Sequence, residues 1–342
     1  MKKLLNVLYV LTEDSHLSRQ GETICVRVGG VEKVRVPVHT LESIICFGNT
    51  SITTPLIEFC GEKGIGLSFL GDYGKFYGRV EGPVRGNVLL RTRQYSFASD
   101  PNKSSEVAYS FLLAKIANGR NVIVRYIRDN PECPEINALR ASVVNLSNLA
   151  KHLKPVLPIE KLRGFEGMAA NVYFSVFDHL IKMDKDNFYF RVRSRRPPLD
   201  NINAILSFLY MLLTHDARSA LEGVGLDPAV GYLHAMRPGR PSLALDLIEE
   251  LRSPLCDRLA LSLVNLRQLQ AKDFKLGPDG VSMSDNARRT VLSAWQERKK
   301  EEIDHPYLNE KVSIGLILHV QAQLLARYLR GDIDGYPPFY WR

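Results

Sequence analysis

The chain has 342 residues, of which 45% are hydrophobic, and it carries a formal net charge of +8. A chain of this length can bury a large core and more often forms two domains than one. The positive charge favours an anionic partner, with nucleic acid first and a membrane surface second, and no segment is apolar over a length that would span a bilayer.

The cysteines and the N-terminal segment indicate where the protein works. The five cysteines are dispersed, odd in number and lack a CxxC pair, which favours free thiols in a reducing cytoplasm over a zinc ribbon. The apolar run in MKKLLNVLYVL is short, contains Asn6 and precedes no small-residue cleavage site. We therefore predict a first strand rather than a signal peptide, and a cytoplasmic protein without a membrane partner.

Residues 1–84 are predicted to form a β-rich domain. Six short segments rich in Val, Ile and aromatic side chains are typical of strands: NVLYVL, TICVRV, KVRVPV, SIICFG, IGLSFL and FYGRV. One short helix is expected from Pro55 to Lys63. A β unit with exposed edges often pairs with another sheet or another copy of itself. His16 and His39 have no acidic or cysteine neighbours at ligand spacing, so both are predicted to be structural.

Residues 85–342 are predicted to form a mostly α-helical domain, which makes the fold class α+β with two domains. The boundary is placed at GPVRGN (82–87), because two glycines and a proline interrupt regular structure. Apolar residues then recur at helical spacing. The expected helices are Ser105–Ile127, Ile136–His152, Ile159–Met183, Asn203–Thr214, Leu255–Gln270, Asn286–Glu302 and Leu308–Leu329. The aromatic tail GDIDGYPPFYWR is expected to dock on a surface.

Glu166 falls within the apolar stripe of the helix expected at 159–183, which comprises Leu162, Ala169, Tyr173, Val176 and Leu180. A carboxylate on a buried face is costly unless it is protonated, paired or bound to a metal. The small residues beside it allow a helix or a bulky ligand to approach. The alternative is that Glu166 pairs with Arg163 or a distant arginine.

A basic run follows that helix, with Arg191, Arg193, Arg195 and Arg196 just after an aromatic triplet. Arginine suits phosphate because its fork donates two parallel hydrogen bonds. The alternative is a solvated loop, which is what most charge runs are. Asp200 is positioned to cap the next helix.

The segment GYLHAMRPGRPSLALDLIEELR, at 231–252, combines acidic and basic side chains around one histidine. Its first half is expected to be a loop carrying His234, and Ser242 is predicted as the N-cap of a short helix. Asp246, Glu249 and Glu250 are neighbours at helical spacing. Histidine with carboxylates suits a divalent metal, whereas the alternative is a solvated acidic helix face.

These segments resemble the CRISPR-associated spacer-acquisition integrase family, known as Cas-one, and within it the I-C group. The resemblance is carried by RGFEGMAANVYF around Glu166, RSRRPPLDNINAILSFLY from Arg193, GLDPAVGYLH ending at His234 and RPSLALDLIEELR from Arg240. Four ordered motifs are far more specific than one. The resemblance covers most of the helical domain and extends into the β-rich one.

The resemblance implies a dimerising β domain and a helical domain that holds one divalent ion, Mg²⁺ or Mn²⁺. The implied metal ligands and catalytic residues are Glu166, His234 and Glu249, with Asp246 as a supporting acid. Glu249 stands where many relatives of the family carry aspartate, which keeps the charge and adds one methylene of reach.

The resemblance also implies the reaction: a 3′-hydroxyl of a short DNA fragment attacks a phosphodiester of the CRISPR repeat, and water in its place gives nuclease activity. No ATP is needed, in keeping with the lack of a GxxxxGK[ST] loop. The implied assembly is two dimers bridged by a dimer of the smaller Cas-two protein, a heterohexamer. The arginines expected near the DNA are Arg193, Arg195, Arg196, Arg237, Arg240 and Arg252.

Two other functions remain open from the residues alone. One is a non-enzymatic DNA-binding scaffold, which predicts Glu166 buried against Arg163 and remote from His234. The other is a general structure-specific nuclease without an integration role.

Overall fold

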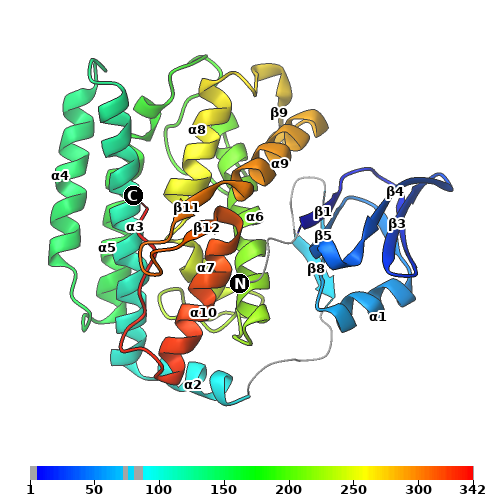
Figure 1. The fold of residues 1–342 in the computed structure, drawn as a ribbon. Coiled ribbons are helices and arrows are strands. Elements are labelled where there is room, and N and C mark those ends of the chain that lie inside the picture. Colours follow the sequence, from blue (N-terminus) through cyan, green and yellow to red (C-terminus); the bar gives the residue numbers. More distant parts are fainter. Residues whose placement is uncertain (1–5, 72–75, 81–87, 342) are drawn as a thin grey trace. The chain divides into compact units, whose positions relative to one another are not determined.

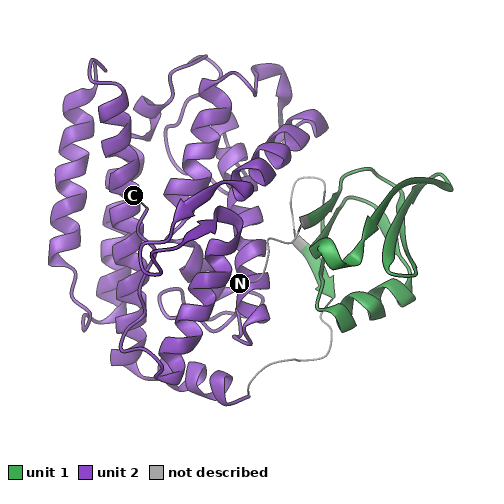
Figure 2. Cartoon of the chain, viewed as in Figure 1, with its two compact units in different colours: residues 1–86 green, residues 87–342 purple. Residues whose placement is uncertain are grey.

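The computed structural model describes residues 6–71, 76–80 and 88–341 (Figure 1). The chain divides into two compact units, residues 1–86 and residues 87–342 (Figure 2). The boundary expected at residue 84 lies outside the described residues. The strand-rich first unit and the helical second unit confirm the predicted α+β fold class.

The described residues of the first unit form two four-stranded sheets, one α-helix and a 3₁₀ turn at Val38–Thr40 (Figure 1). One sheet has the order β1-β5-β7-β8, with β1, β5 and β7 parallel and β8 antiparallel to β7. Its strands are β1 (Asn6–Val10), β5 (Leu41–Phe47), β7 (Gly66–Leu70) and β8 (Phe76–Val80). The second sheet, β4-β3-β2-β6, comprises β4 (Val31–Pro37), β3 (Thr23–Val28), β2 (Ser15–Gln20) and β6 (Thr50–Ile52). The helix is α1 (Thr54–Lys63).

The apolar residues of these strands and of α1 form one core, which includes the completely buried Leu17, Ile24, Ile44 and Leu56. The six predicted strands and the predicted helix are confirmed. The strands β2 and β6 were missed, because β2 is mostly polar and β6 has only three residues. His16 links these two strands, with Nδ1 2.9 Å from the hydroxyl of Ser51, which agrees with a structural role.

The second unit is mostly helical, as predicted (Figure 1). Its α-helices are α2 (Val88–Ser99), α3 (Pro101–Asp129), α4 (Ile136–His152), α5 (Ile159–Ser175), α6 (Asn201–Gly223), α7 (Ser242–Ile248), α8 (Arg258–Asn265), α9 (Asp285–Lys300) and α10 (Ile317–Arg330). A π-helical stretch, Arg252–Asp257, leads into α8. The long helix α3 packs against both α4 and α5. Asp200 caps α6 as predicted, since its carboxylate accepts a hydrogen bond from the amide of Asn203 at 2.7 Å.

Several predicted helix bounds were wrong. The helix expected at 159–183 ends at Ser175 and continues as a 3₁₀ turn, Phe177–Leu180. The helix expected at 308–329 begins only at Ile317, because β12 (Lys311–Ser313) pairs with β11 (Glu302–Asp304). A second hairpin, β9 (Phe274–Gly277) with β10 (Gly280–Met283), lies where neither strand nor helix was expected.

The C-terminal tail docks as predicted, with Tyr336, Phe339 and Trp341 buried. Its anchor is the completely buried carboxylate of Glu250, which accepts hydrogen bonds from the Tyr336 hydroxyl at 2.6 Å and the Phe339 amide at 2.8 Å. Asn118 of α3 adds a bond from the Trp341 amide at 2.7 Å. The tail is thus tied to the residue that directly follows Glu249.

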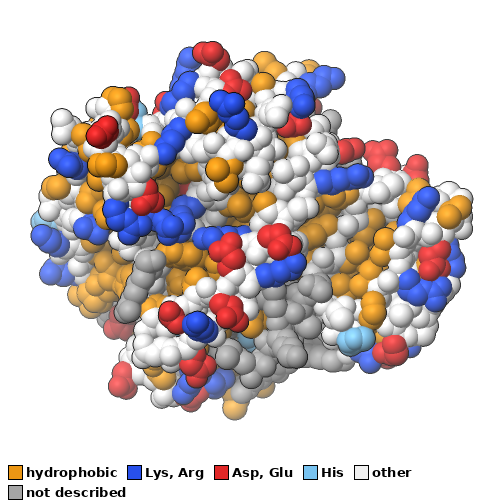
Figure 3. All heavy atoms as spheres, turned by 45° about the horizontal axis from the view of Figure 1, so that its top comes forward, with side chains coloured by type: hydrophobic (Ala, Val, Ile, Leu, Met, Phe, Trp, Pro, Cys, Tyr) orange, Lys and Arg blue, Asp and Glu red, His pale blue; other side chains and the backbone are white. Residues whose placement is uncertain are grey.

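The surface shows where positive charge gathers on the helical unit. On the face drawn in Figure 3, a row of Lys and Arg side chains crosses the left part of the view, with hydrophobic side chains beside it. None of the helices described between residues 6 and 341 is long and apolar enough to cross a membrane.

Candidate metal and DNA site

The loop between α6 and α7 is organised by the buried carboxylate of Asp246. Its two oxygens accept hydrogen bonds from the amides of Tyr232 at 2.6 Å, Leu233 at 3.0 Å and His234 at 2.9 Å. Oδ1 also lies 2.6 Å from Nδ1 of His234. A carboxylate at Nδ1 fixes the proton on that nitrogen and leaves Nε2 as a free ligand, which is the arrangement seen around metal-bound histidines.

Other contacts hold the same loop in place. A Cβ on Gly231 would lie 2.7 Å from the carbonyl carbon of Ser242 and 2.8 Å from a carboxylate oxygen of Asp246, so only glycine fits. The prediction that Ser242 is an N-cap is wrong: it is the first helical residue, and its hydroxyl donates to the carbonyl of Ala235 at 3.0 Å. Arg163 of α5 donates to the carbonyl of Leu233 at 2.8 Å.

Glu249 follows α7 directly and its side chain is completely buried. Its carboxylate lies 2.7 Å from the guanidinium of Arg252 and 2.9 Å from the ammonium of Lys115. Nε2 of His234 lies 3.8 Å from Oε1. Burial opposes the charged form of Glu249, but the positive charges of Arg252 and Lys115 beside it outweigh that effect and lower the pKa to about 2. Glu249 is therefore ionised at neutral pH.

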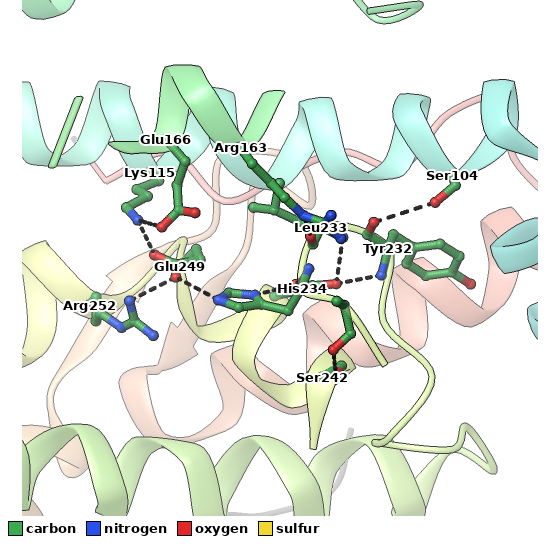
Figure 4. A network of polar contacts seen from close by, with 12 residues as sticks. Ser104, Lys115, Arg163, Glu166, Tyr232, Leu233, His234, Ser242, Glu249 and Arg252 are labelled. Atoms are coloured by element: carbon green, nitrogen blue, oxygen red, sulfur yellow. Dashed lines mark hydrogen bonds and ion pairs between the residues drawn. The ribbon is translucent and has the colours of Figure 1, made fainter. Parts of the chain in front are cut away.

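Glu166 of α5 is linked to Glu249 by the ammonium of Lys115. Oε1 of Glu166 lies 2.7 Å from the Lys115 ammonium, which also contacts Glu249 (Figure 4). Arg163 does not pair with Glu166, because its guanidinium binds Glu160 and the carbonyl of Leu233. The arrangement that the scaffold alternative predicts for Glu166 is therefore wrong.

The three acidic residues of this segment do not share one face. Asp246, Glu249 and Glu250 are all buried, which excludes the solvated-face alternative. Asp246 binds the His234 loop, whereas Glu250 faces the C-terminal tail and also accepts from Gln321 at 2.9 Å. Only Glu249 faces Lys115. Helical spacing makes these three residues neighbours in the chain, but their carboxylates contact different partners.

The side chains of Glu166, His234 and Glu249 are of the chemical types that bind divalent cations. Two carboxylates and an imidazole nitrogen suit Mn²⁺ or Mg²⁺, and Asp246 supplies the outer-shell contact that such a histidine requires. As they stand, however, no three His, Cys, Asp or Glu side chains in the described part of the chain are spaced to hold a metal ion. The Lys115 ammonium lies between the two glutamates.

A pocket opens beside this cluster. It is lined by Lys115, Ile116, Gly119, Leu146, Glu166, Ala169, Ala170, Tyr173, Phe174, Arg193, Arg195, Tyr210, Arg252, Ser253 and Asp257. Two guanidiniums lie over the ring of Tyr210, with that of Arg193 5.1 Å and that of Arg252 5.0 Å from the ring centroid. Nε of each arginine is buried and makes no hydrogen bond with a described residue. Both therefore retain a donor for an anion.

Asp257 lies at the back of the pocket and was missed in the sequence. It accepts hydrogen bonds from the hydroxyls of Tyr210 at 2.6 Å and Tyr173 at 3.0 Å. Burial raises its pKa to about 6, although both tyrosines and the nearby arginines oppose the shift. The bond to Tyr210 holds the ring over which the guanidiniums of Arg193 and Arg252 lie.

The remaining candidate arginines lie outside this lining. Arg240 is partly buried, and its pKa is lowered by that burial and by the charges of Arg237, Arg163 and Arg195. The charges of these three arginines therefore add to the positive potential around Arg240, as expected where an anion is to bind. Arg196 is exposed and is not among the residues that line the pocket.

Comparisons with known proteins identify the family of the chain. The family model described as CRISPR associated protein Cas1 matches residues 8–297. A protein of Chlorobaculum tepidum named CRISPR-associated endonuclease Cas1 1 is 49% identical over the whole of both chains. A second, named CRISPR-associated endonuclease Cas1 2, from Rhodospirillum rubrum, is 51% identical, again over the whole of both.

Solved structures share the fold. A Cas1 protein from Thermotoga maritima aligns with a TM-score of 0.80 at 24% identity, over 96% of this chain and 97% of the other. A casposase bound to its integration product aligns with a TM-score of 0.82 at 21% identity, over 97% and 93%. With a family model matched over most of its length and two relatives near half identity from end to end, this chain belongs to the CRISPR-associated Cas1 family.

Proposed function

We propose that this protein is a divalent-metal-dependent DNA endonuclease and integrase of CRISPR adaptation, which inserts short DNA fragments into the CRISPR array. One observation carries the proposal: Glu249, fully buried, faces both Nε2 of His234 and the ammonium that binds Glu166. Relatives at about half identity are named endonucleases, which supports the same class of reaction.

In this proposal Glu166, His234 and Glu249 hold Mg²⁺ or Mn²⁺, and Asp246 orients His234 through Nδ1. Such an ion, when bound, polarises a phosphodiester and makes an attacking hydroxyl more acidic. The chain's own contribution is to neutralise the phosphate. Arg193 and Arg252 each keep a buried Nε–H and line the same pocket as Glu166, and a guanidinium binds a phosphate oxygen more strongly than a neutral donor does.

The attacking group decides the outcome of the reaction. The 3′-hydroxyl of the fragment attacks a phosphate of the repeat and displaces the 3′-oxygen of the neighbouring nucleotide in the repeat strand. One phosphodiester forms as another breaks, so the fragment is joined to the repeat without ATP. Water in the same position hydrolyses the bond and gives cleavage. Binding of the duplex fragment and of the repeat is expected to depend steeply on salt, because phosphate contacts release counterions.

The proposed assembly follows the family resemblance. The strand-rich unit pairs with a second copy to make a homodimer, and two such dimers join a Cas2 dimer in a heterohexamer. The proposed location is the cytoplasm.

The test supplies a short DNA duplex with free 3′ ends and a supercoiled plasmid carrying a CRISPR repeat, with Mn²⁺ and the Cas2 partner. His234→Ala is compared with His152→Ala, an exposed histidine on α4 that serves as a matched control. We expect the wild type and the control to join the duplex to the plasmid. The His234 variant is expected to bind DNA but not to join it.

The other outcomes separate the alternatives. Cleavage without joining, even with the partner present, would indicate a structure-specific nuclease. DNA binding with neither cleavage nor joining would indicate a scaffold. Joining by His234→Ala at the wild-type rate would show that the metal centre is assigned to the wrong residues.

A further inference from the structure

Lys115 lies on the buried side of the long helix α3. It lies on α3 one turn after the completely buried Phe111 and next to the buried Ile116, and only 15% of its side chain is exposed. Its ammonium lies 2.7 Å from Oε1 of Glu166 and 2.9 Å from Oε2 of Glu249 (Figure 4). It is thus shared by two of the proposed metal ligands.

The electrostatics explain why a cation is needed there. Glu249 is fully buried and ionised, and Glu166 brings a second carboxylate next to it. Two like charges at this separation repel each other, and a buried carboxylate without a partner is costly. The Lys115 ammonium offsets both effects by binding one oxygen of each carboxylate. A divalent cation bound by the same two carboxylates would offset them in the same way.

We infer that Lys115 is the internal counter-ion of this metal site: its ammonium holds Glu166 and Glu249 together without metal and competes with a divalent ion for them. The inference rests on the proposed function, because it takes these carboxylates as metal ligands. It assigns Lys115 a positioning role that sets how tightly the metal binds.

The surroundings give the displaced side chain somewhere to go. Lys115 itself lines the pocket beside the cluster, together with the small residues Gly119, Ala169 and Ala170. A lysine side chain is flexible, so rotation about its own torsions can carry the ammonium away from the carboxylates. Each metal ion that binds then moves one positive charge into the pocket of Arg193 and Arg252.

The test measures Mn²⁺ binding to the full-length protein by the EPR signal of free Mn²⁺. Lys115→Met is compared with wild type and with Lys103→Met, which removes an exposed lysine from the same helix. We expect Lys115→Met to bind Mn²⁺ roughly tenfold more tightly, because the ion no longer competes with the ammonium for the carboxylates. A coupling of this size is common between two ligands of one protein. The Lys103 variant is expected to bind like the wild type.

A second readout is thermal unfolding with and without metal. In EDTA, Lys115→Met is expected to melt below the wild type, because Glu249 then keeps only Arg252 as a close cationic partner. At saturating Mn²⁺ the difference should shrink. Lys115→Gln is expected to shift affinity in the same direction, and Lys115→Arg, which keeps the charge, is expected not to tighten binding.

Two different failures are distinguishable. If the Lys115→Met and Lys115→Gln proteins bind Mn²⁺ no more tightly than the wild type, Lys115 is not a competitor and the inference is wrong. If neither the wild type nor any Lys115 variant binds Mn²⁺ at one ion per chain, the proposed metal centre itself is wrong, and the inference falls with it.

Discussion

Nδ1 of His234 lies 2.6 Å from a carboxylate oxygen of Asp246, and the same carboxylate accepts the amide hydrogens of Tyr232, Leu233 and His234. One side chain of α7 therefore fixes both the course of the loop and the orientation of the imidazole. Nε2 is turned toward Glu249 as a result. The supporting role predicted for Asp246 from the family resemblance has a physical basis in these four contacts.

Asp246→Asn is expected to weaken both Mn²⁺ binding and strand joining by about 10- to 100-fold, the usual effect of losing an outer-shell partner. The amide keeps an oxygen for the loop but no longer holds His234 as a charged acceptor. Mn²⁺ titration and joining rates measured over a range of Mn²⁺ concentrations check this. If excess Mn²⁺ leaves the joining rate as low as before, Asp246 acts on something other than metal binding.

Glu250 is expected to make stability depend on pH. Burial raises its pKa from 4.5 to about 8, although Tyr336, Phe339 and Gln321 donate hydrogen bonds that oppose the shift. A carboxyl group with a raised pKa in the folded chain takes up a proton on folding between those two values. The free energy of unfolding therefore falls as pH rises from 4.5 to 8, by at most about 1.4 kcal/mol per pH unit.

Glu250→Gln should remove this slope, whereas Glu132→Gln, an exposed control, should keep it. Urea unfolding between pH 6 and 8 is the measurement. That range avoids most of the titration of Asp257, whose pKa of about 6 gives a slope of the same sign at lower pH. An unchanged slope in the Glu250 variant would mean that the carboxyl group is not titrating there.

Arg195 and Arg196 are neighbours in the chain that the structure separates. Both are exposed, but Arg195 lines the pocket with Glu166, whereas Arg196 lies outside it. Each alanine variant is expected to reduce the slope of log affinity against log salt by about 0.9, the value for one phosphate contact on duplex DNA. Strand joining at saturating DNA should fall further in Arg195→Ala. Equal joining rates for the two variants would contradict a role for the pocket in the reaction.

The sequence predicted much of the site because its parts are local. Glu166 broke an apolar helical stripe, and His234 lay on a loop rich in Gly and Pro next to an acidic helix. Lys115 interrupts the buried face of α3 in the same way as Glu166 interrupts that of α5. Searching the apolar stripes for lysines as well as for acids would have found it. Lysines with long stems are so common at helix edges that the signal is weak from sequence alone.

Long-range pairing accounts for what was missed. Asp257 becomes part of the pocket only in the folded chain, where the hydroxyls of Tyr173 on α5 and Tyr210 on α6 bind its carboxyl group. The split of Asp246, Glu249 and Glu250 among three partners depends on the His234 loop, on Lys115 of α3 and on the tail that returns to Glu250. The hairpins at 274–283 and 302–313 were missed because short strands carry too few residues to show a period. Membership of the I-C group stays a prediction.

The most direct test is a crystal structure of the protein soaked with Mn²⁺, read by anomalous diffraction at the manganese absorption edge. The account predicts one strong peak between Glu166, His234 and Glu249, with the Lys115 ammonium moved away from both carboxylates. A peak elsewhere, or an ammonium still bound to Glu166 and Glu249 at saturating Mn²⁺, would contradict it.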